Sequence, residues 1–345
     1  MVRSGRRGFE HRRRPGWTRP QDIMIRRIIR HRLTRRLATA LGTLLGVAIL
    51  VFIMLRAIPG DQVTAQFGLE AAGLTEAQRA QLEAYYGLDR PLVVQFFSWL
   101  GNLFSGNLGF SSRAQMSVAA LTAQSLPVTV ELAVLTIVLS LLIGVPLGML
   151  SASKPNSLRD GLGQTVGLAG LSIPAFLLGS SLLAWLAGSG FNPNGLGYAS
   201  LTQQPWLNLQ QMLLPAVVLA FGIAAPIMRT TRTAVLEVRS LDFIRTARAK
   251  GVPVRRLQWR HVLGNALVPI TTMTGLQFGY LLGGAIVVEQ IFSLPGIGRQ
   301  VLIGIQQKEY AVVQSTVLII ATGFVLVNLA TDALYRLIDP RVRVS

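Results

Sequence analysis

The sequence contains no cysteine and very little histidine. Among its 345 residues the histidines are His11, His31 and His261. The absence of cysteine excludes disulfides, thiolate metal ligands, cysteine nucleophiles and thiol redox switches. Because histidine is so rare, a histidine-based metal site is not expected either.

Charge is also scarce, and most of it has one sign. Asp, Glu, Lys and Arg make up 14% of the chain, whereas a typical soluble domain contains about 25%. The chain has 33 basic residues, 30 of them arginine, against 15 acidic residues, which gives a net charge of +18. With 51% hydrophobic residues and a mean hydropathy of +0.48, this composition favours a membrane protein over a nucleic-acid-binding one.

The sequence motifs of nucleotide-binding proteins and hydrolases are missing. The chain has no G-x-x-x-x-G-K-[ST], G-x-S-x-G, H-E-x-x-H or G-x-G-x-x-G pattern. A membrane-embedded hydrolase would need a nucleophile beside a base, and the one histidine beyond the N-terminal tail is His261. We therefore predict no catalytic residue, no metal site and no cofactor held by this chain.

Long uncharged runs predict six membrane-spanning helices. A helix needs about 20 apolar residues to cross the hydrocarbon layer. One uncharged run, 161–228, is 68 residues long, and a segment rich in Gly, Asn and Pro divides it into two spans. The predicted spans are 37–55, 132–153, 163–187, 211–229, 261–288 and 310–331.

The distribution of basic residues indicates how these spans are oriented. Lys and Arg collect in the cytoplasmic segments of membrane proteins. Of the 33 basic residues, 27 lie in the two termini and in alternate connecting segments, five lie in the other segments, and Arg56 stands at a boundary. We therefore predict an all-α polytopic membrane protein with six transmembrane helices and both termini in the cytoplasm.

This topology divides the chain into five regions. They are a basic cytoplasmic tail at 1–36 with disorder over 1–23, a first transmembrane helix at 37–58, an extracytoplasmic segment at 59–125, a five-helix core at 126–338 that includes a cytoplasmic loop at 229–262, and a cytoplasmic tail at 339–345.

Small residues and prolines inside the spans suggest how the helices pack. Glycines four apart let helix backbones approach closely and predict a packed bundle. Pro174, Pro215 and Pro269 either kink their spans or mark helix starts, and the sequence leaves both open. The glycine pairs are Gly42/Gly46, Gly144/Gly148, Gly163/Gly167 and Gly279/Gly283.

Ionisable residues within the spans are few. Glu131 and Asp332 lie near span ends, and the middles of all six spans carry no charge. An intramembrane charge is a functional hypothesis by default, but placement at a helix end, or pairing with an arginine across the bundle, is the favoured explanation for both residues. A proton- or sodium-coupled carrier usually has several such groups near the midplane, so ion-coupled transport is disfavoured.

The most informative segment is 238–269. Ser240 suits an N-cap and Asp242 a first turn, while Gly251 suits the position after a helix and Pro253 the start of the next helix. The sequence therefore predicts a short amphipathic helix, a break, and a second helix that enters the fifth span. The residues predicted to share a face are Leu241, Ile244 and Ala247 in the first helix, and Val254, Leu257 and His261 in the second.

A helix of this kind has two possible partners. It could lie on the lipid surface, or it could be presented to the groove of a cytoplasmic protein. Periodicity alone does not separate these possibilities.

The motif R-T-A-R-A-K-G at 245–251, followed by His261, Asn265 and Pro269, resembles the cytoplasmic coupling loop of binding-protein-dependent ABC importer permeases. More narrowly, the chain resembles the first of the two membrane subunits in the dipeptide/oligopeptide/nickel permease family. Further motifs of that family are R-A-I-P-G-D at 56–61, Y-G-L-D-R-P-L-V-V-Q at 86–95, G-N-L-G-F-S at 106–111, L-P-V-T-V-E at 126–131, S-I-P-A-F at 172–176, V-E-Q-I-F-S-L-P-G-I-G at 288–298 and D-A-L-Y-R-L-I-D-P-R at 332–341.

The resemblance implies an ATPase-coupling role for the cytoplasmic loop. Against the general importer signature E-A-A-x3-G-x9-I-x-L-P, only Ala247 and Gly251 match, and Arg245 occupies the position of the glutamate. A glutamate salt bridge to the ATPase therefore does not carry over to this chain. The implied coupling residues are Leu241, Asp242, Ile244, Arg245, Thr246, Ala247, Lys250, Gly251, Leu257, His261 and Asn265.

The motif after the fifth span is unusually apolar for a loop. Its side chains either re-enter the bundle and seal its outer mouth or contact a docked binding protein, and both alternatives need the glycines for tight turns. The residues assigned to this outer gate or contact are Glu289, Phe292, Leu294, Pro295, Gly296, Ile297 and Gly298.

The resemblance implies a permease subunit in the bacterial cytoplasmic membrane that imports peptides or similar small solutes. The implied partners are a second homologous permease, two ATP-binding cassette ATPases that bind ATP and Mg, an extracytoplasmic substrate-binding protein, and membrane lipid. No nucleic acid is expected. The alternatives are an ATP-independent channel or secondary carrier and, disfavoured by the missing catalytic groups, a membrane enzyme.

The topology can be tested with single cysteines, since the native chain has none. We expect Gln203→Cys and Thr75→Cys to react with an impermeant thiol reagent added to intact cells, because both lie in segments predicted to be outside. Arg248→Cys should react only after the membrane is permeabilised. Labelling of position 248 in intact cells would invert the predicted orientation.

Overall fold

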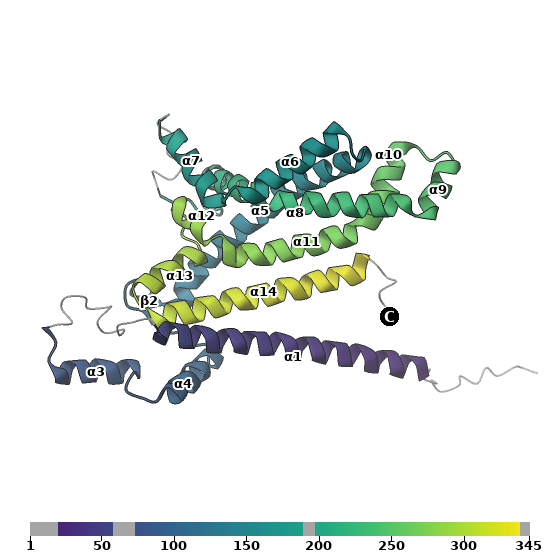
Figure 1. Ribbon diagram of the computed structural model, residues 1–345. Helices are drawn as coiled ribbons and strands as arrows, with labels where there is room; N and C mark the ends of the chain where they lie inside the picture. Colours follow the sequence, from purple (N-terminus) through teal and green to yellow (C-terminus); the bar gives the residue numbers. More distant parts are fainter. Residues whose placement is uncertain (1–19, 58–72, 189–196, 339–345) are drawn as a thin grey trace, which may run out of the picture. The chain divides into compact units, whose positions relative to one another are not determined.

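In the computed structural model, which describes residues 20–57, 73–188 and 197–338, nearly all of the described chain is helical (Figure 1). The chain divides into two compact units, Met1–Gly46 and Val47–Ser345. The described elements are α1 (Pro20–Ala57), α3 (Glu76–Tyr86), α4 (Leu92–Phe104), β1 (Phe110–Ser111), β2 (Met116–Ser117), α5 (Val118–Ser153), α6 (Leu158–Ser172), α7 (Ala175–Gly188), α8 (Pro205–Ser240), α9 (Asp242–Ala249), α10 (Val254–Arg256), the π-helix η2 (Leu257–Val262), α11 (Leu263–Gly284), α12 (Ile286–Ile291), α13 (Ile297–Gln306) and α14 (Tyr310–Ile338).

The predicted all-α membrane fold is confirmed, although the number of spans is not. Four described helices are long and apolar enough to cross a membrane, and a bent pair brings the number to five. The predicted fifth span coincides with α11, which is 22 residues long and uncharged but contains Asn265, Gln277 and three threonines. The count of six and the cytoplasmic location of both termini therefore stay predictions.

The predicted span at 163–187 is not one continuous helix, because this region forms two helices. α6 and α7 meet at an angle of 89°. Pro174 stands at the break, where its ring and missing N–H are incompatible with a continuous helix. The Pro174 carbonyl accepts hydrogen bonds from the amides of Leu177 and Leu178 at 3.0 and 3.1 Å, so this proline starts α7. Pro215 and Pro269, by contrast, lie inside α8 and α11.

Helices α5 and α8 extend beyond the predicted spans. α5 begins at Val118, where the Ser117 hydroxyl caps it by accepting from the amide of Ala120, so its first turns belong to the predicted extracytoplasmic segment. α8 begins at Pro205 and continues to Ser240, which makes the first part of the predicted loop 229–262 helical. Charged residues indicate where the apolar part of a helix ends, and the predicted spans are bounded in this way. The helix itself continues until its backbone is capped or broken.

The N-terminal tail also differs in part from the prediction. α1 begins at Pro20, so residues 20–23 are helical, and proline is favoured at a first helical position. The rest of the predicted disordered tail, 1–19, and the C-terminal tail at 339–345 lie outside the described residues.

The predicted close packing at glycine is confirmed between α5 and α8. A Cβ atom on Gly144 would lie 2.8 Å from the Ala224 carbonyl oxygen, and one on Gly148 would lie 2.6 Å from that of Met228. A Cβ on Gly279 would lie 2.7 Å from Phe324 of α14. The main apolar core is built around α5 and α8 and includes Leu132, Met212 and Ile227.

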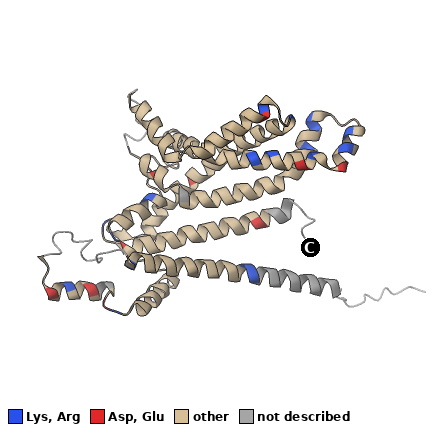
Figure 2. Ribbon diagram, in the orientation of Figure 1, with Lys and Arg blue, Asp and Glu red and all other residues tan. Residues whose placement is uncertain are grey.

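Basic residues gather where α8 ends and where α9 and α10 lie, while α11 carries no charged residue (Figure 2). One carboxylate is buried among these bases. Asp160 is 1% exposed. Its carboxylate accepts hydrogen bonds from Nε and Nη2 of Arg232, at 2.8 and 2.7 Å. Its other donors are the Ser151 hydroxyl, the Asn156 amide and the Gln164 side chain. Asp160 therefore joins α6 to both α5 and α8.

We expect Asp160→Asn to lower the apparent melting temperature of the detergent-solubilised protein. The substitution keeps the shape of the side chain but removes its charge and replaces one of the two oxygens that accept from the Arg232 guanidinium with an NH2 group, so the buried cation loses its counter-charge. Differential scanning fluorimetry measures the change. Arg159→Gln, at the exposed neighbouring position, is the matched control and should melt like the wild type. Equal melting of both variants would show that the ion pair does not stabilise the bundle.

Candidate functional site

The loop that follows α8 has the predicted helix–break–helix form. α9 runs from Asp242 to Ala249, and Gly251 follows it with a left-handed φ of +77°. The Gly251 amide donates to the Arg248 carbonyl and the Val252 amide donates to that of Ala247, at 3.0 and 3.2 Å. These bonds satisfy carbonyls at the helix end, and a residue with a left-handed backbone is required to make them. Gly251 is thus the residue that turns the chain back toward the bundle.

The predicted cap at Ser240 is wrong. Ser240 is the last residue of α8, and its hydroxyl donates to the Glu237 carbonyl at 2.7 Å. Leu241 occupies the N-cap position of α9 without a side-chain hydrogen bond. Pro253 likewise precedes α10 as its N-cap rather than opening it. Ser240 does not cap α9 because α8 continues through the basic segment to Ser240 itself. Only Leu241 then lies between α8 and α9.

One side of α9 anchors the loop to the bundle. Ile244 is 1% exposed and packs with Val235 and Val238 of α8 and with Leu257 and Val262 of η2. Ala247 packs against the same cluster. Leu241, which was predicted to share this face, is 44% exposed because it lies outside the helix. The anchor therefore consists of Ile244 and Ala247.

The opposite side of α9 is open. Phe243 is 43% exposed, and the Asp242 and Arg245 side chains are 95% and 75% exposed, with their charged atoms 3.5 Å apart. Thr246, Arg248 and Lys250 are exposed as well. The loop thus presents a mixed basic and apolar surface on a helix whose other face is fixed.

The second helix of the loop leads directly into α11. Leu257 is buried and His261 is half-buried, both within the π-helical turn η2. Asn265 in α11 donates from Nδ2 to the His261 carbonyl at 2.6 Å. This turn gives a continuous helical connection between the loop and the predicted fifth span.

The outer motif is held together by the buried carboxylate of Glu289. Thr129 of α5 donates from its hydroxyl to Glu289 Oε1 at 2.6 Å, and the Arg299 amide donates to Oε2 at 2.9 Å. The Ile297 amide in turn donates to the Thr129 hydroxyl at 2.9 Å. Glu289 and Thr129 therefore satisfy orphan amides in the first turn of α13, where a negative charge is also favoured by the helix dipole. Burial raises the pKa of Glu289, and its hydrogen bonds with Thr129 and with the amides of Arg299 and Gly298 offset part of that rise.

Two glycines make room for this carboxylate. A Cβ on Gly296 would lie 2.3 Å from Glu289 Cδ, and one on Gly298 would lie 2.7 Å from Ile286 and 3.0 Å from Glu289 Oε2. The glycines of the motif thus serve the packing of Glu289 in addition to the turn.

The apolar residues of the outer motif point inward. Phe292 is 2% exposed, and Leu294 and Ile297 are 0% exposed. Pro295 and Ser293 are the exposed residues of the turn. This burial supports the interpretation in which the motif closes the outer part of the bundle, and it leaves the turn at 293–295 as the surface that a docked protein could reach.

The two predicted intramembrane acids do not come together. Glu131 of α5 accepts hydrogen bonds from the Tyr198 hydroxyl at 3.4 Å and from Asn208 Nδ2 of α8 at 3.3 Å, so its partners are neutral groups and not an arginine. Burial and the nearby Glu131 charge raise the pKa of Tyr198 to about 12. Asp332 lies half-buried on α14.

Two polar residues of these sites were missed by the sequence analysis. Asp160 is not singled out by any sequence motif, although the spacing of Ser157 and Asp160 is that of a helix cap and its first turn. Thr129 was noted only as part of the motif at 126–131. Nothing in the local sequence indicates that it bridges to residues 289 and 297, which are more than a hundred positions away.

Two family models and several known proteins match most of this chain. The family described as "Binding-protein-dependent transport system inner membrane component" matches residues 144–344, and the family of the corresponding N-terminal region matches 28–133. A probable peptide ABC transporter permease protein of Sinorhizobium fredii is 38% identical over 299 residues, which cover 86% of this chain and 94% of that protein. A glutathione transport system permease protein of Escherichia coli is 37% identical over 305 residues, with 86% and 94% covered. Among solved structures, one described as an amino acid ABC transporter with histidines aligns at 18% identity with a TM-score of 0.43, over 65% of this chain and 94% of that one.

We expect Glu289→Gln and Thr129→Val each to destabilise the start of α13, by about 1–2 kcal/mol, the range for loss of a helix cap or a buried hydrogen bond. Hydrogen exchange should quicken at the amides of Ile297 and Arg299, which donate to these side chains. Gln290→Ala, at an exposed position of α12 next to Glu289, is the control. Unchanged exchange in both variants would mean that the carboxylate and hydroxyl do not cap α13.

Proposed function

The chain belongs to the family of binding-protein-dependent transport system inner membrane components, and we propose that it forms one half of the pathway of an importer for peptides or peptide-like solutes. The proposed assembly contains a second homologous permease, two cytoplasmic ATPases that bind ATP and Mg, and an extracytoplasmic substrate-binding protein. In this assembly the chain binds no nucleotide, and ATP hydrolysis takes place on its partners. The peptide and glutathione permeases among its relatives support the substrate class.

The observation that carries this proposal is the form of the loop between α8 and α11. A docking helix must be rigid enough to transmit force and exposed enough to be bound. In α9, Ile244 provides the first property through its burial among α8 and η2, and the exposed face around Phe243, Arg245 and Thr246 provides the second. A helix that is embedded on one side and open on the other is suited to a groove on a cytoplasmic partner.

The proposed coupling follows from the connections of this loop. α9 joins the cytoplasmic end of α8 by a single residue, and η2 continues into α11 without a break. A movement of α9 is therefore carried into two helices of the bundle. The ATPases would bias a two-state equilibrium of that bundle through their different contacts with α9 in the two states.

The loop departs from the general importer signature at the position of its glutamate. Arg245, which stands in place of the signature glutamate, is 3.5 Å from Asp242 of the same helix, with both side chains largely exposed. We infer that this chain offers a basic group to its ATPase partner at this position, and that the complementary partner surface is acidic.

We expect Gly251→Val to abolish coupling while the protein still inserts into the membrane. Valine is strained at the left-handed φ of +77°, by about 1–2 kcal/mol, although no atom of the described chain lies within 4 Å of the added Cβ. Uptake of labelled dipeptide or glutathione by cells, and ATP hydrolysis by the purified assembly, should fall together. Gly251→Asn is the matched control, since asparagine tolerates this conformation.

Three results would contradict the proposal. Normal uptake by Gly251→Val would exclude a coupling role for the loop. Substrate uptake that persists without ATP would favour a channel or carrier. Purification of the wild-type chain without any ATPase would remove the partner on which the proposal depends.

A further inference from the structure

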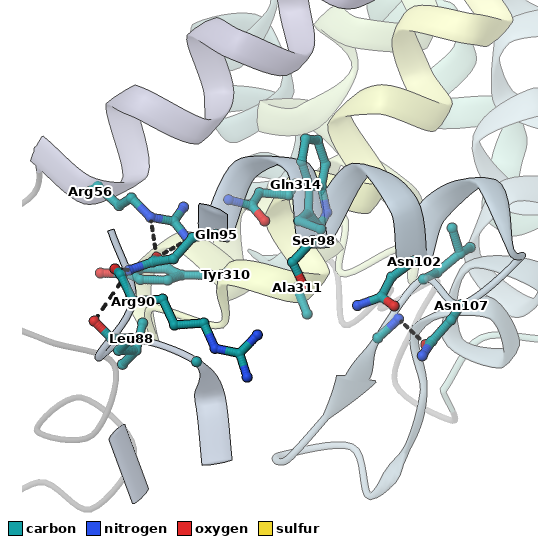
Figure 3. Close-up of a pocket in the computed structure, with 14 residues that line it drawn as sticks. Arg56, Leu88, Arg90, Gln95, Ser98, Asn102, Asn107, Tyr310, Ala311 and Gln314 are labelled. Carbon is teal, nitrogen blue, oxygen red and sulfur yellow. Dashed lines mark hydrogen bonds between the residues drawn. The ribbon is translucent and has the colours of Figure 1, made fainter. Parts of the chain in front are cut away.

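A polar cavity lies at one end of the Val47–Ser345 unit, apart from both the α9 loop and the outer motif. Its volume is about 220 Å³, and it is formed by the end of α1, the segment before α4, α4 itself, the residues before β1 and the start of α14 (Figure 3). α1 ends and α14 begins at this cavity, and both contain candidate membrane spans. The cavity therefore lies at the level where two spans leave the apolar layer, which is the level of lipid headgroups.

The lining of the cavity is rich in hydrogen-bond donors and positive charge. Arg56 and Arg90 both line it, and neither has a carboxylate partner among the described residues. Arg56 donates from Nε and Nη2 to Gln95 Oε1, at 3.0 and 2.8 Å, and its guanidinium carbon lies 3.5 Å from the centre of the Phe52 ring. Arg90 is exposed, and its guanidinium makes no hydrogen bond to the described part of the chain. In Figure 3, Arg90, Arg56 and Gln95 lie at the same end of the cavity.

A buried donor in the wall of the cavity has no acceptor in the part of the chain that the structure describes. Gln314 of α14 is 3% exposed, and its Nε2 has no hydrogen-bond partner among the described residues. A buried amide that is left unpaired is destabilising, so an acceptor other than the described residues is expected here. Two guanidinium groups together with a neutral amide donor match a group that has several oxygens and a negative charge, as a phosphate has.

The surroundings of the cavity are apolar and open. α4 has no buried residue, and Leu92, Val93, Phe97 and Phe104 are 59–84% exposed. On α1, Ile53 and Met54 are 59% and 60% exposed. Phe96 and Trp99 of α4 pack on Phe52 of α1, with ring centroids 5.2 and 6.3 Å apart. α4 is thus held against the end of α1 with an apolar face turned outward, as in helices that lie at a membrane surface.

We propose that this cavity binds the phosphodiester headgroup of an anionic phospholipid in the extracytoplasmic leaflet, with the acyl chains along the exposed faces of α1 and α4. The cavity is smaller than the roughly 300 Å³ at which pockets for drug-sized ligands begin, so it holds the headgroup and leaves the chains outside. Arg90 supplies the charge that is free to reach the phosphate, Arg56 contributes a second positive charge that is held in place by Gln95, and Gln314 donates from the wall formed by α14. Bound lipid then joins α4 to the first and last spans.

The test uses the full chain, solubilised in detergent with its associated subunits and stripped of lipid. Binding of dioleoyl phosphatidylglycerol, of dioleoylglycerol and of inorganic phosphate is measured separately by native mass spectrometry. We expect phosphatidylglycerol to bind and the other two not to, because the site needs both the phosphate and the chains. Arg90→Gln should weaken phosphatidylglycerol binding about tenfold, the equivalent of one charge-assisted hydrogen bond. Arg79→Gln, an exposed arginine of α3 that does not line the cavity, is the matched control.

A second variant separates binding from folding. Gln314→Met keeps the size of the side chain and removes the unpaired donor, so the lipid-free protein should melt at the same or a higher temperature while phosphatidylglycerol affinity falls. Equal binding of dioleoylglycerol would show an apolar surface without a headgroup site. Binding of inorganic phosphate without phosphatidylglycerol would assign the cavity to a free anion. Unchanged affinity in both variants would overturn the proposal.

Discussion

The close packing of helices α5 and α8 depends on Gly144 and Gly148 of α5. Both face the backbone of α8, and neither has a side chain that would keep the two helices apart. A Cβ at either position would stand 2.6–2.8 Å from a carbonyl oxygen of α8, which no relaxation of a flexible side chain could relieve. Within a membrane the apolar surfaces of helices gain little from meeting one another, so close backbone approach of this kind stabilises the bundle through packing. The rest of the described core is arranged around this pair.

Polar contacts fix the same pair at both ends. At the end where the basic residues gather, Asp160 links α6 to Arg232 of α8, and Arg239 of α8 donates to the Ala152 carbonyl of α5. At the other end, Glu131 of α5 accepts from Asn208 of α8. Between these contacts the two helices meet mainly through apolar residues and glycine, with one long hydrogen bond from the Ser140 hydroxyl to the Ala220 carbonyl. Specific hydrogen bonds at the ends set the register, and packing in the middle sets the distance.

This frame connects the two sites that the sequence singles out. The α9 loop leaves the end of α8 and rests on it through Ile244, while the outer motif is attached to α5 through Thr129. Under the proposed function, a force applied at α9 reaches the outer motif through one pair of tightly packed helices. The burial of Phe292, Leu294 and Ile297 makes the outer motif part of the bundle, so it would respond to such a movement as part of the same body.

The sequence alone determined the class of protein, the apolar segments and the helix–break–helix form of the loop, because these depend on local properties: the length of uncharged runs, and the left-handed backbone that Gly251 supplies. It could not determine where α5 and α8 end, since charge reports the edge of the apolar layer and not the end of a helix. It also left open whether Pro174, Pro215 and Pro269 interrupt their spans, and only the first does, because the other two are accommodated within helices. The roles of Thr129, Glu289, Asp160 and Arg232 were decided by the tertiary structure alone. Each depends on hydrogen bonds between residues 72 to 168 positions apart, which no local pattern records.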